Sequence, residues 1–225
     1  MEMYDAMRAR FGHRGWWPSR AGRESPEGRL EICLGAILTQ NTNWRNVERA
    51  IENLRQAGRL GVAAIDDTPH EALAELIRPA GYFNVKAKRL KDFIAAVRED
   101  WGEDVAGFLG RSGGVLREEL LAIRGIGRET ADSIILYAAG KPSFVVDAYT
   151  FRILYRHELV GPEDDYESVK ELFESSLPED VDLWNDYHAQ LVETGKHFCK
   201  KRRPKCAGCP LEPFPHDPTA GMEPE

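Results

Sequence analysis

The sequence predicts an all-α protein, and the spacing of its apolar residues is the main reason. In most segments apolar residues recur three and four positions apart, as in helices, and the alternation typical of strands is scarce. One segment, Leu30–Leu38, is apolar nearly all round, which predicts a buried helix at the centre of the fold. We expect helices over residues 3–11, 30–38, 44–56, 68–81, 85–101, 115–122, 127–139, 147–158, 165–175 and 182–197.

The domain organisation follows from the chain length and from these helices. With 225 residues, the chain can form one large domain or two small ones. We expect one helical domain over residues 30–140 and a second that combines 1–29 with 141–225. Within the first, Thr68-Pro69-His70-Glu71 predicts a helix start, because Thr can cap, Pro suits the first helical position and Glu can bond back.

Composition narrows the class of protein. Hydrophobic residues make up 42% and charged residues 30% of the chain, which is ordinary for a soluble globular protein. No apolar run is long enough to span a bilayer, and the N-terminal MEMYDAMRAR lacks the apolar core of a signal peptide. We therefore expect a cytoplasmic protein that has no membrane partner.

The net charge of −7 argues against a protein coated in basic residues, but it leaves room for a local basic face. Two basic clusters occur, and each taken alone is equally typical of a solvated helix face or loop. The first cluster contains Lys86, Lys88, Arg89 and Lys91, and the second contains Lys200, Lys201, Arg202, Arg203 and Lys205.

A glycine-containing turn lies between two of the expected helices, within residues 120–149. Gly125 and Gly127 permit unusual backbone conformations and leave backbone N–H groups uncovered. The next helix begins there, so its free N–H groups and the positive end of its dipole form a site suited to a phosphate. Small Ala131 lets the two helices approach closely. A plain helix–helix turn is the alternative, but the full spacing favours nucleic-acid binding.

A single carboxylate, Asp147, follows the apolar run Phe144–Val146. On spacing alone, the commoner explanation is an ordinary N-cap for the following helix. Capping and a chemical role are compatible with each other.

Several motifs together resemble the helix-hairpin-helix DNA glycosylases, the superfamily of endonuclease III, over almost the whole chain. They are LTQNT at 38–42, RGIGRETA at 124–131, Val146-Asp147 with Phe151-Arg152, and Gly195 followed by Cys199-x6-Cys206-x2-Cys209. The resemblance implies a six-helix barrel domain with the hairpin, a second helical domain with a C-terminal cysteine loop, and an active site in the cleft between them. It also implies a monomer that acts on damaged double-stranded DNA at the nucleoid.

The resemblance assigns roles to particular residues. Asp147 stabilises the positive charge that develops on the sugar as a base leaves, and orients or deprotonates water. Members that cut the strand carry a lysine where this chain has Glu129, which cannot form a Schiff base. We therefore expect a monofunctional glycosylase with weak or absent lyase activity. The implied DNA contacts are Gln40, Asn41, Lys86, Lys88, Gly125, Gly127 and Arg128.

The tryptophans indicate which damaged base the protein removes. Trp16-Trp17-Pro18 and Thr-Gln-Asn-Thr-x-Trp44 look most like the 3-methyladenine glycosylase branch, where Trp16, Trp17, Trp44 and Glu129 would form the pocket for a flipped base. Alkylated purines are cationic, and a cation stacks well on tryptophan. Alternatively, the loops that contain these tryptophans simply pack onto the core. The alternative functions of the protein are a glycosylase for oxidised pyrimidines or mismatches and a non-catalytic lesion-binding protein.

Three of the four cysteines lie close together, at Cys199, Cys206 and Cys209, and in a cytosolic chain this pattern favours a metal site over disulfides. They resemble the iron–sulfur loop of endonuclease III, but Pro215 stands where the family has its fourth cysteine. A [4Fe–4S] cluster with a non-cysteine ligand such as His216 or Asp217, a zinc site and a metal-free remnant all remain open.

Overall fold

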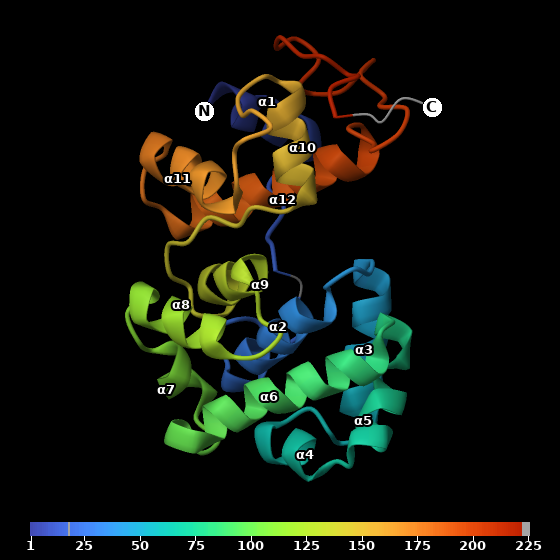
Figure 1. The fold of residues 1–225 in the computed structure, drawn as a ribbon, viewed down its shortest axis with the longest axis vertical. Coiled ribbons are helices and arrows are strands. Elements are labelled where there is room, and N and C mark those ends of the chain that lie inside the picture. Colours follow the sequence, from blue (N-terminus) through green and yellow to red (C-terminus); the bar gives the residue numbers. More distant parts are fainter. Residues whose placement is uncertain (18, 222–225) are drawn as a thin grey trace. The chain divides into compact units, whose positions relative to one another are not determined.

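The computed structural model describes residues 1–17 and 19–221, and these residues form helices and no strand (Figure 1). The predicted all-α fold class is therefore confirmed. Pro18, the last residue of the Trp-Trp-Pro motif, lies outside the described residues. Two compact units occur, Met1–Trp16 with Pro142–Glu225 and Trp17–Lys141. The first boundary between them falls nearer to the N-terminus than the predicted domain boundary, and the domain assignment itself stays a prediction.

Unit Trp17–Lys141 is arranged around α2 (Pro26–Leu38), which contacts α3, α6, α7, α9 and η2. All of Leu30–Leu38 is buried, so the predicted central helix is confirmed. The side chain of Ser25 caps this helix by accepting the N–H of Gly28 at 3.0 Å. The other elements are α3 (Trp44–Gln56), α4 (Val62–Asp67), α5 (His70–Leu76), η1 (Arg78–Ala80), α6 (Phe83–Trp101), α7 (Val105–Leu109), α8 (Gly113–Ala122), α9 (Arg128–Ser133) and η2 (Ile134–Ala138).

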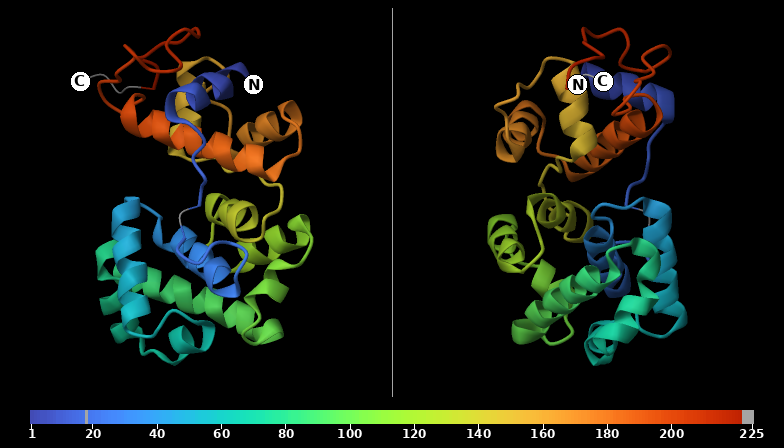
Figure 2. Two further views of the ribbon diagram at one scale, coloured as in Figure 1. Left: turned by 180° about the vertical axis from the view of Figure 1, so that it is seen from behind. Right: turned by 45° about the vertical axis from the view of Figure 1, so that its right-hand side comes forward.

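The other unit packs on α12 (Val181–His197), which lies against α1 (Glu2–Phe11) and α10 (Ala148–Arg156), as both views of Figure 2 show. Its fourth helix is α11 (Tyr166–Ser176). A hydrogen bond fastens α1 to α12, since the hydroxyl of Tyr4 donates to Oδ2 of buried Asp186 at 2.9 Å. The core also holds Phe144, which stacks on Phe173 with ring centroids 3.9 Å apart.

Two short helices, α4 and α7, are missing from the prediction. Each spans too few residues for its apolar spacing to stand out from the flanking segments. The helix predicted to start at Thr68-Pro69-His70-Glu71 begins at His70, but the predicted cap by Thr68 is wrong. Thr68 follows α4 and donates its hydroxyl to the carbonyl of Ala64 at 2.6 Å, while Pro69 occupies the N-cap of α5 without a side-chain cap. Within the described part of the chain, no helix combines the length and apolarity needed to cross a bilayer.

Candidate active site

The hairpin forms as the glycine spacing predicts. Helix α8 ends at Ala122 and α9 begins at Arg128, with Gly127 as its N-cap. Gly125 has φ +89°, a conformation that favours glycine. Ile123 and Ile126 are buried and hold the turn against the unit, whereas Gly125, Gly127 and Arg128 are exposed. The turn therefore presents its glycine backbone to solvent.

Gln40 fastens the turn after α2 to this hairpin. Its Nε2 donates to the carbonyl of Gly125 at 3.1 Å and to Oγ1 of Thr130 at 2.9 Å, and its Oε1 accepts from Nη1 of Arg89. The amide of half-buried Gln40 thus supports the predicted DNA-binding hairpin. The neighbouring Asn41 is exposed, with φ +55°. Of the two predicted DNA contacts in this turn, Asn41 has the side chain that is open to solvent.

Lys86 does not occupy the position that a DNA contact requires. It is 1% exposed, and its Nζ donates to the carbonyls of Leu38 at 2.9 Å and Ala80 at 2.7 Å. Burial, together with the smaller effect of the charge of Arg89, lowers the pKa of Lys86 to about 8. Its predicted role as a DNA contact is therefore wrong, because the ammonium group caps the C-terminal end of α2.

The spacing of apolar residues could have predicted that Lys86 is buried. Lys86 lies four and seven positions before the buried Leu90 and Phe93, on one helix face. Lys88, in contrast, is exposed and pairs with Asp92 at 2.8 Å.

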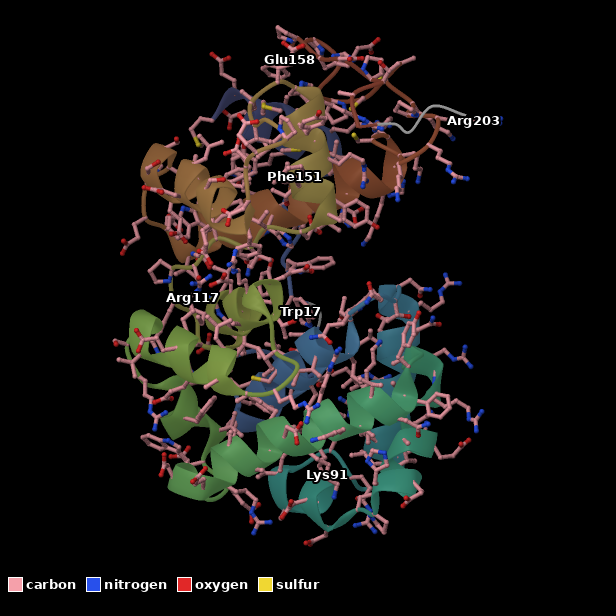
Figure 3. All side chains as sticks on the ribbon, in the orientation of Figure 1. Trp17, Lys91, Arg117, Phe151, Glu158 and Arg203 are labelled. Atoms are coloured by element: carbon pink, nitrogen blue, oxygen red, sulfur yellow. The ribbon has the colours of Figure 1, made fainter. Side chains whose placement is uncertain are left out.

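The three tryptophans that were predicted to form the base pocket do not all belong to the same unit. Trp17 packs edge to face on Trp44, with ring centroids 4.9 Å apart, and also contacts Tyr137 at 5.0 Å. Both indoles cover α2 at Gly35, where a Cβ atom would lie 3.4 Å from each (Trp17 is labelled in Figure 3). The N–H of Trp44 is buried, with no hydrogen-bond partner among the described residues.

Trp16 belongs to the other unit, where Nζ of Lys196 lies 5.3 Å from its ring centroid. Glu129, the fourth predicted pocket residue, is exposed in the first turn of α9.

Asp147 caps α10 and also keeps part of its carboxylate at the surface. Oδ1 accepts the N–H of Thr150 at 2.7 Å and its hydroxyl at 2.9 Å. Oδ2 lies 3.7 Å from Nε2 of His188, and 12% of the side chain of Asp147 is exposed. Burial by itself raises the pKa of Asp147, but the neighbouring His188 and the two bonds from Thr150 outweigh it, so the pKa is lowered. Asp147 is therefore a fixed anion at neutral pH.

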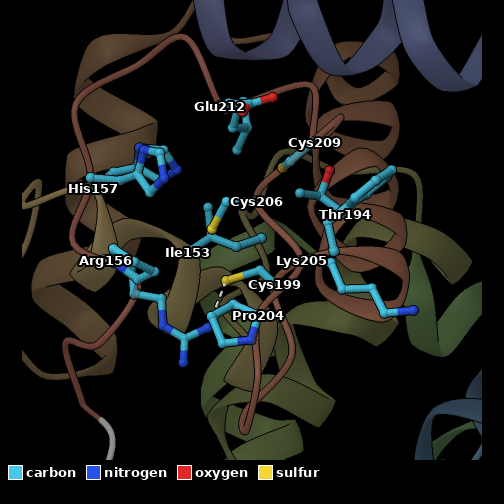
Figure 4. A pocket seen from close by; sticks show the side chains of 14 residues that line it. Ile153, Arg156, His157, Thr194, Cys199, Pro204, Lys205, Cys206, Cys209 and Glu212 are labelled. Atoms are coloured by element: carbon cyan, nitrogen blue, oxygen red, sulfur yellow. Dashed lines mark hydrogen bonds between the residues drawn. The ribbon is translucent and has the colours of Figure 1, made fainter.

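The three clustered cysteines line one pocket, and Figure 4 shows their sulfur atoms within it. Nη1 of the buried Arg156 donates to Sγ of Cys199 at 3.2 Å and to the carbonyl of Lys200 at 2.7 Å. Burial raises the pKa values of Cys206 and Cys209, and the neighbouring thiols raise them further. The guanidinium of Arg156 fastens the start of the loop and brings positive charge to the thiols.

His216 lines the same pocket, as do two residues that sequence reasoning missed, His157 and Glu212. The ring of His157 lies 5.2 Å from that of His216. Asp217, the other suggested ligand, instead accepts the N–H of Thr219 at 2.8 Å and its hydroxyl at 2.7 Å. The chemistry of this donor set suits a metal group that needs three thiolates and one further ligand. Across residues 1–17 and 19–221, however, no three such side chains are arranged to bind a single metal ion.

Comparison with known proteins gives the family. Residues 34–179, more than half of the chain, match the family described as "HhH-GPD superfamily base excision DNA repair protein". The chain therefore belongs to the HhH-GPD superfamily. It is 44% identical over 215 residues to the "Putative DNA repair glycosylase MJ1434" of Methanocaldococcus jannaschii, covering 95% of this chain and 94% of that one. It is 32% identical over 186 residues to endonuclease III of Thermotoga maritima, covering 81% and 80%.

Two solved structures extend this comparison. The 3-methyladenine DNA glycosylase MagIII of H. pylori, bound to 1,N6-ethenoadenine, aligns with a TM-score of 0.70 and 29% identity, covering 87% of this chain and 98% of that one. A non-covalent endonuclease III–DNA complex aligns with a TM-score of 0.78 and 22% identity, covering 96% and 93%, and shows the same fold. The chain is a DNA repair glycosylase of the endonuclease III superfamily.

Proposed function

We propose that this glycosylase removes alkylated purines such as 3-methyladenine from double-stranded DNA by hydrolysis and leaves an abasic site. The observation that carries the proposal is the carboxylate of Asp147. Its Oδ1 is fixed by two bonds from Thr150, its pKa is lowered, and part of the side chain reaches the surface. A fixed anion needs little reorganisation when positive charge develops beside it.

Hydrolysis of the glycosidic bond requires few catalytic side chains because the leaving base is already positively charged. The bond between C1′ of the sugar and the base nitrogen breaks, and its electron pair neutralises the base. The sugar becomes cationic, and Asp147 stabilises that charge. Water then forms the new bond to C1′ and loses a proton to Asp147 or to solvent. The target nucleotide must first leave the base stack.

Base choice in this proposal rests on the tryptophans. An indole face attracts a cationic base by roughly 0.5–2 kcal/mol more than a neutral one. Trp17 and Trp44 are held together over Gly35. The likeness to MagIII, a 3-methyladenine glycosylase at 29% identity, supports the same substrate class. The family resemblance also proposes roles in base recognition for Trp16 and Glu129.

The proposed grip on DNA uses the exposed part of the hairpin and of the turn after α2. The backbone N–H groups at Gly125 and Gly127 and the guanidinium of Arg128 are suited to phosphates. Exposed Asn41 and Lys88 add further polar contacts, and Gln40 supports the hairpin from behind. We propose that the chain binds as a monomer.

The proposed absence of strand cutting rests on Glu129. This residue occupies the first turn of α9, directly after Arg128. A carboxylate cannot form an imine with the sugar, and an arginine stays protonated, so neither residue supplies the amine nucleophile of a lyase.

For the cysteine loop we propose a [4Fe–4S] cluster held by Cys199, Cys206 and Cys209, with His216 as the fourth ligand. When bound, the cluster crosslinks the loop and so holds its basic residues in place. The test is the purified protein itself: absorbance near 400 nm with about four irons per chain, lost in Cys206→Ser, supports the cluster. Stoichiometric zinc without that absorbance, or neither metal, contradicts it.

A panel of lesion duplexes tests the proposed substrate. Wild-type protein and Asp147→Asn are incubated with duplexes that contain 3-methyladenine, an oxidised pyrimidine or a mismatch, and base release is measured. We expect release of the alkylated purine by the wild type only. Faster release of oxidised pyrimidines would show an endonuclease III-like specificity instead. Tight binding without release from any duplex would show a lesion-binding protein that has lost catalysis.

A further inference from the structure

A buried histidine faces the candidate catalytic carboxylate. His188 lies on α12, is 5% exposed, and places Nε2 3.7 Å from Oδ2 of Asp147. The two oxygens of Asp147 are therefore constrained from two directions, Oδ1 by Thr150 within α10 and Oδ2 by His188 from α12. Neither the motifs of the sequence nor the comparisons assign a role to His188.

The packing of α10 on α12 sets the distance between His188 and Asp147. His188 and Gly195 are seven positions apart, so they lie on one face of α12. At Gly195 a Cβ atom would lie 2.3 Å from Cδ1 of Tyr149, which means that α10 approaches α12 as closely as glycine allows. Further along, Nε of Arg152 donates to the carbonyl of Cys199 at 2.8 Å. Three contacts with α12 and the residues after it, at Asp147, Tyr149 and Arg152 of the α10 segment, thus hold the N-terminus of α10 beside His188.

Other charged side chains of α12 are engaged elsewhere. Asp186 accepts hydrogen bonds from Tyr4 and from the backbone of Arg14. Glu193 pairs with Arg14 at 3.5 Å, His197 at 3.4 Å and Lys196 at 3.6 Å. His188 is the residue of this helix that meets Asp147.

We propose that His188 is a positioning residue of the glycosylase reaction, holding Oδ2 of Asp147 so that the carboxylate faces the sugar as an oriented anion. The proposal rests on the proposed function, because it concerns the same carboxylate. His188 acts through Asp147 and does not touch the substrate. Burial makes a carboxylate anion costly, and an imidazole nitrogen 3.7 Å from Oδ2 offsets that cost electrostatically while the ring limits the directions that the carboxylate can take. The lowered pKa of Asp147 agrees with this role.

The test uses full-length His188→Leu, which removes the ring N–H, and His188→Gln, which keeps a side-chain N–H donor. The matched control is His197→Leu, an exposed histidine of the same helix. For each variant we would measure single-turnover release of 3-methyladenine, affinity for abasic-site DNA and thermal stability. We expect His188→Leu to slow release at least about tenfold with affinity unchanged, His188→Gln to restore the rate to within about threefold of the wild type, and the control to match the wild type.

A double-mutant cycle separates positioning from a general packing role. In the Asp147→Asn background, His188→Leu should change the remaining rate by less than about twofold, since a residue that acts through Asp147 has nothing left to position. His188→Met replaces the leucine variant if the latter does not fold.

Three results would overturn the proposal. The first is an unchanged rate in His188→Leu, and the second is a further full loss in the Asp147→Asn background. The third is equal slowing in the leucine and glutamine variants with equal losses of thermal stability, which would show packing alone. A wild type that releases no base, or an Asp147→Asn variant as fast as the wild type, would overturn the proposed function and this proposal with it. If base release is slowed by Asp147→Asn but is unchanged by His188→Leu, only the proposal for His188 is overturned.

Discussion

Trp17 meets Trp44 edge to face, with ring centroids 4.9 Å apart and ring planes at 88°. Two indoles at right angles do not clamp a flat base between parallel faces. In the proposed pocket, a flipped base would therefore stack on one indole face, with the second indole supporting the first from the side. Gly35 keeps the surface of α2 small beneath them, because a Cβ atom there would already touch both rings at 3.4 Å and a side chain larger than alanine would crowd them.

Trp44→Ala should lose activity on 3-methyladenine and keep its affinity for abasic-site DNA. The expected loss is up to roughly 30-fold, since a cation on an indole face gains about 0.5–2 kcal/mol. Trp44→Phe keeps an aromatic face and serves as the matched control with a smaller loss. Single-turnover release and fluorescence anisotropy measure the two properties. Equal losses of release and of affinity would indicate that Trp44 has a folding role instead.

Wild-type protein should give no covalent adduct when it is incubated with lesion DNA and borohydride. Glu129→Lys places an amine where strand-cutting relatives carry one, in the exposed first turn of α9, and should produce a trapped adduct. Glu129→Gln controls for the loss of the carboxylate. Gel electrophoresis of the trapped species is the measurement. A robust adduct with the wild type would refute the assignment of a monofunctional enzyme.

The two hairpin glycines should respond differently to alanine. Gly125 has φ +89°, and a Cβ atom there would lie 2.6 Å from Cγ of Arg89. Gly125→Ala should therefore lower the free energy of unfolding by about 1–3 kcal/mol. Gly127 has φ −95°, with open space around its Cβ position. Gly127→Ala should change that free energy by less than about 0.5 kcal/mol and still weaken DNA binding.

Urea denaturation and DNA titration of both glycine variants provide these values. Equal stability losses at the two positions would contradict the steric account of the turn. Unchanged DNA affinity in Gly127→Ala would contradict a phosphate contact at its backbone.

Lys86 gives the protein a pH-dependent contribution to stability. Its folded-state pKa of about 8 lies below the ordinary lysine value of about 10.4. Between these values the unfolded chain binds a proton that the folded chain lacks, so stability rises with pH in that window. The free energy of unfolding of the wild type, relative to Lys86→Met, should therefore grow from pH 8 to pH 10.

Lys88→Met, at an exposed position of the same helix, should show no such growth relative to the wild type. A wild-type advantage over Lys86→Met that stays constant from pH 8 to pH 10 would contradict the buried position of the Lys86 ammonium group. Denaturation at several pH values provides the comparison.

The sequence predicted those features that depend on local pattern. The buried helix α2 followed from its all-round apolar character, the hairpin from its glycines, and the capping by Asp147 from its place before α10. Features that depend on contacts between distant segments were missed. Lys86 was taken for a surface charge because its two carbonyl partners belong to other turns of the fold.

The contact between His188 and Asp147 could not be predicted from the sequence for a similar reason. No local pattern links it to Asp147, and the packing of α10 on α12 brings the two together. The clamp of Gln40 on Gly125 and Thr130 likewise joins segments that are far apart in the sequence. Such contacts become visible only when the helices are packed.

We propose above all that Asp147 drives hydrolytic release of an alkylated purine without cutting the strand. The most direct measurement is single-turnover release of 3-methyladenine from a duplex, with strand integrity followed in the same samples, for wild type and Asp147→Asn. We predict release by the wild type with an intact strand until alkali is added, and release at least about 100-fold slower in the variant. Wild-type protein that binds the duplex tightly and releases no base, or a variant that releases it at the wild-type rate, would contradict the claim.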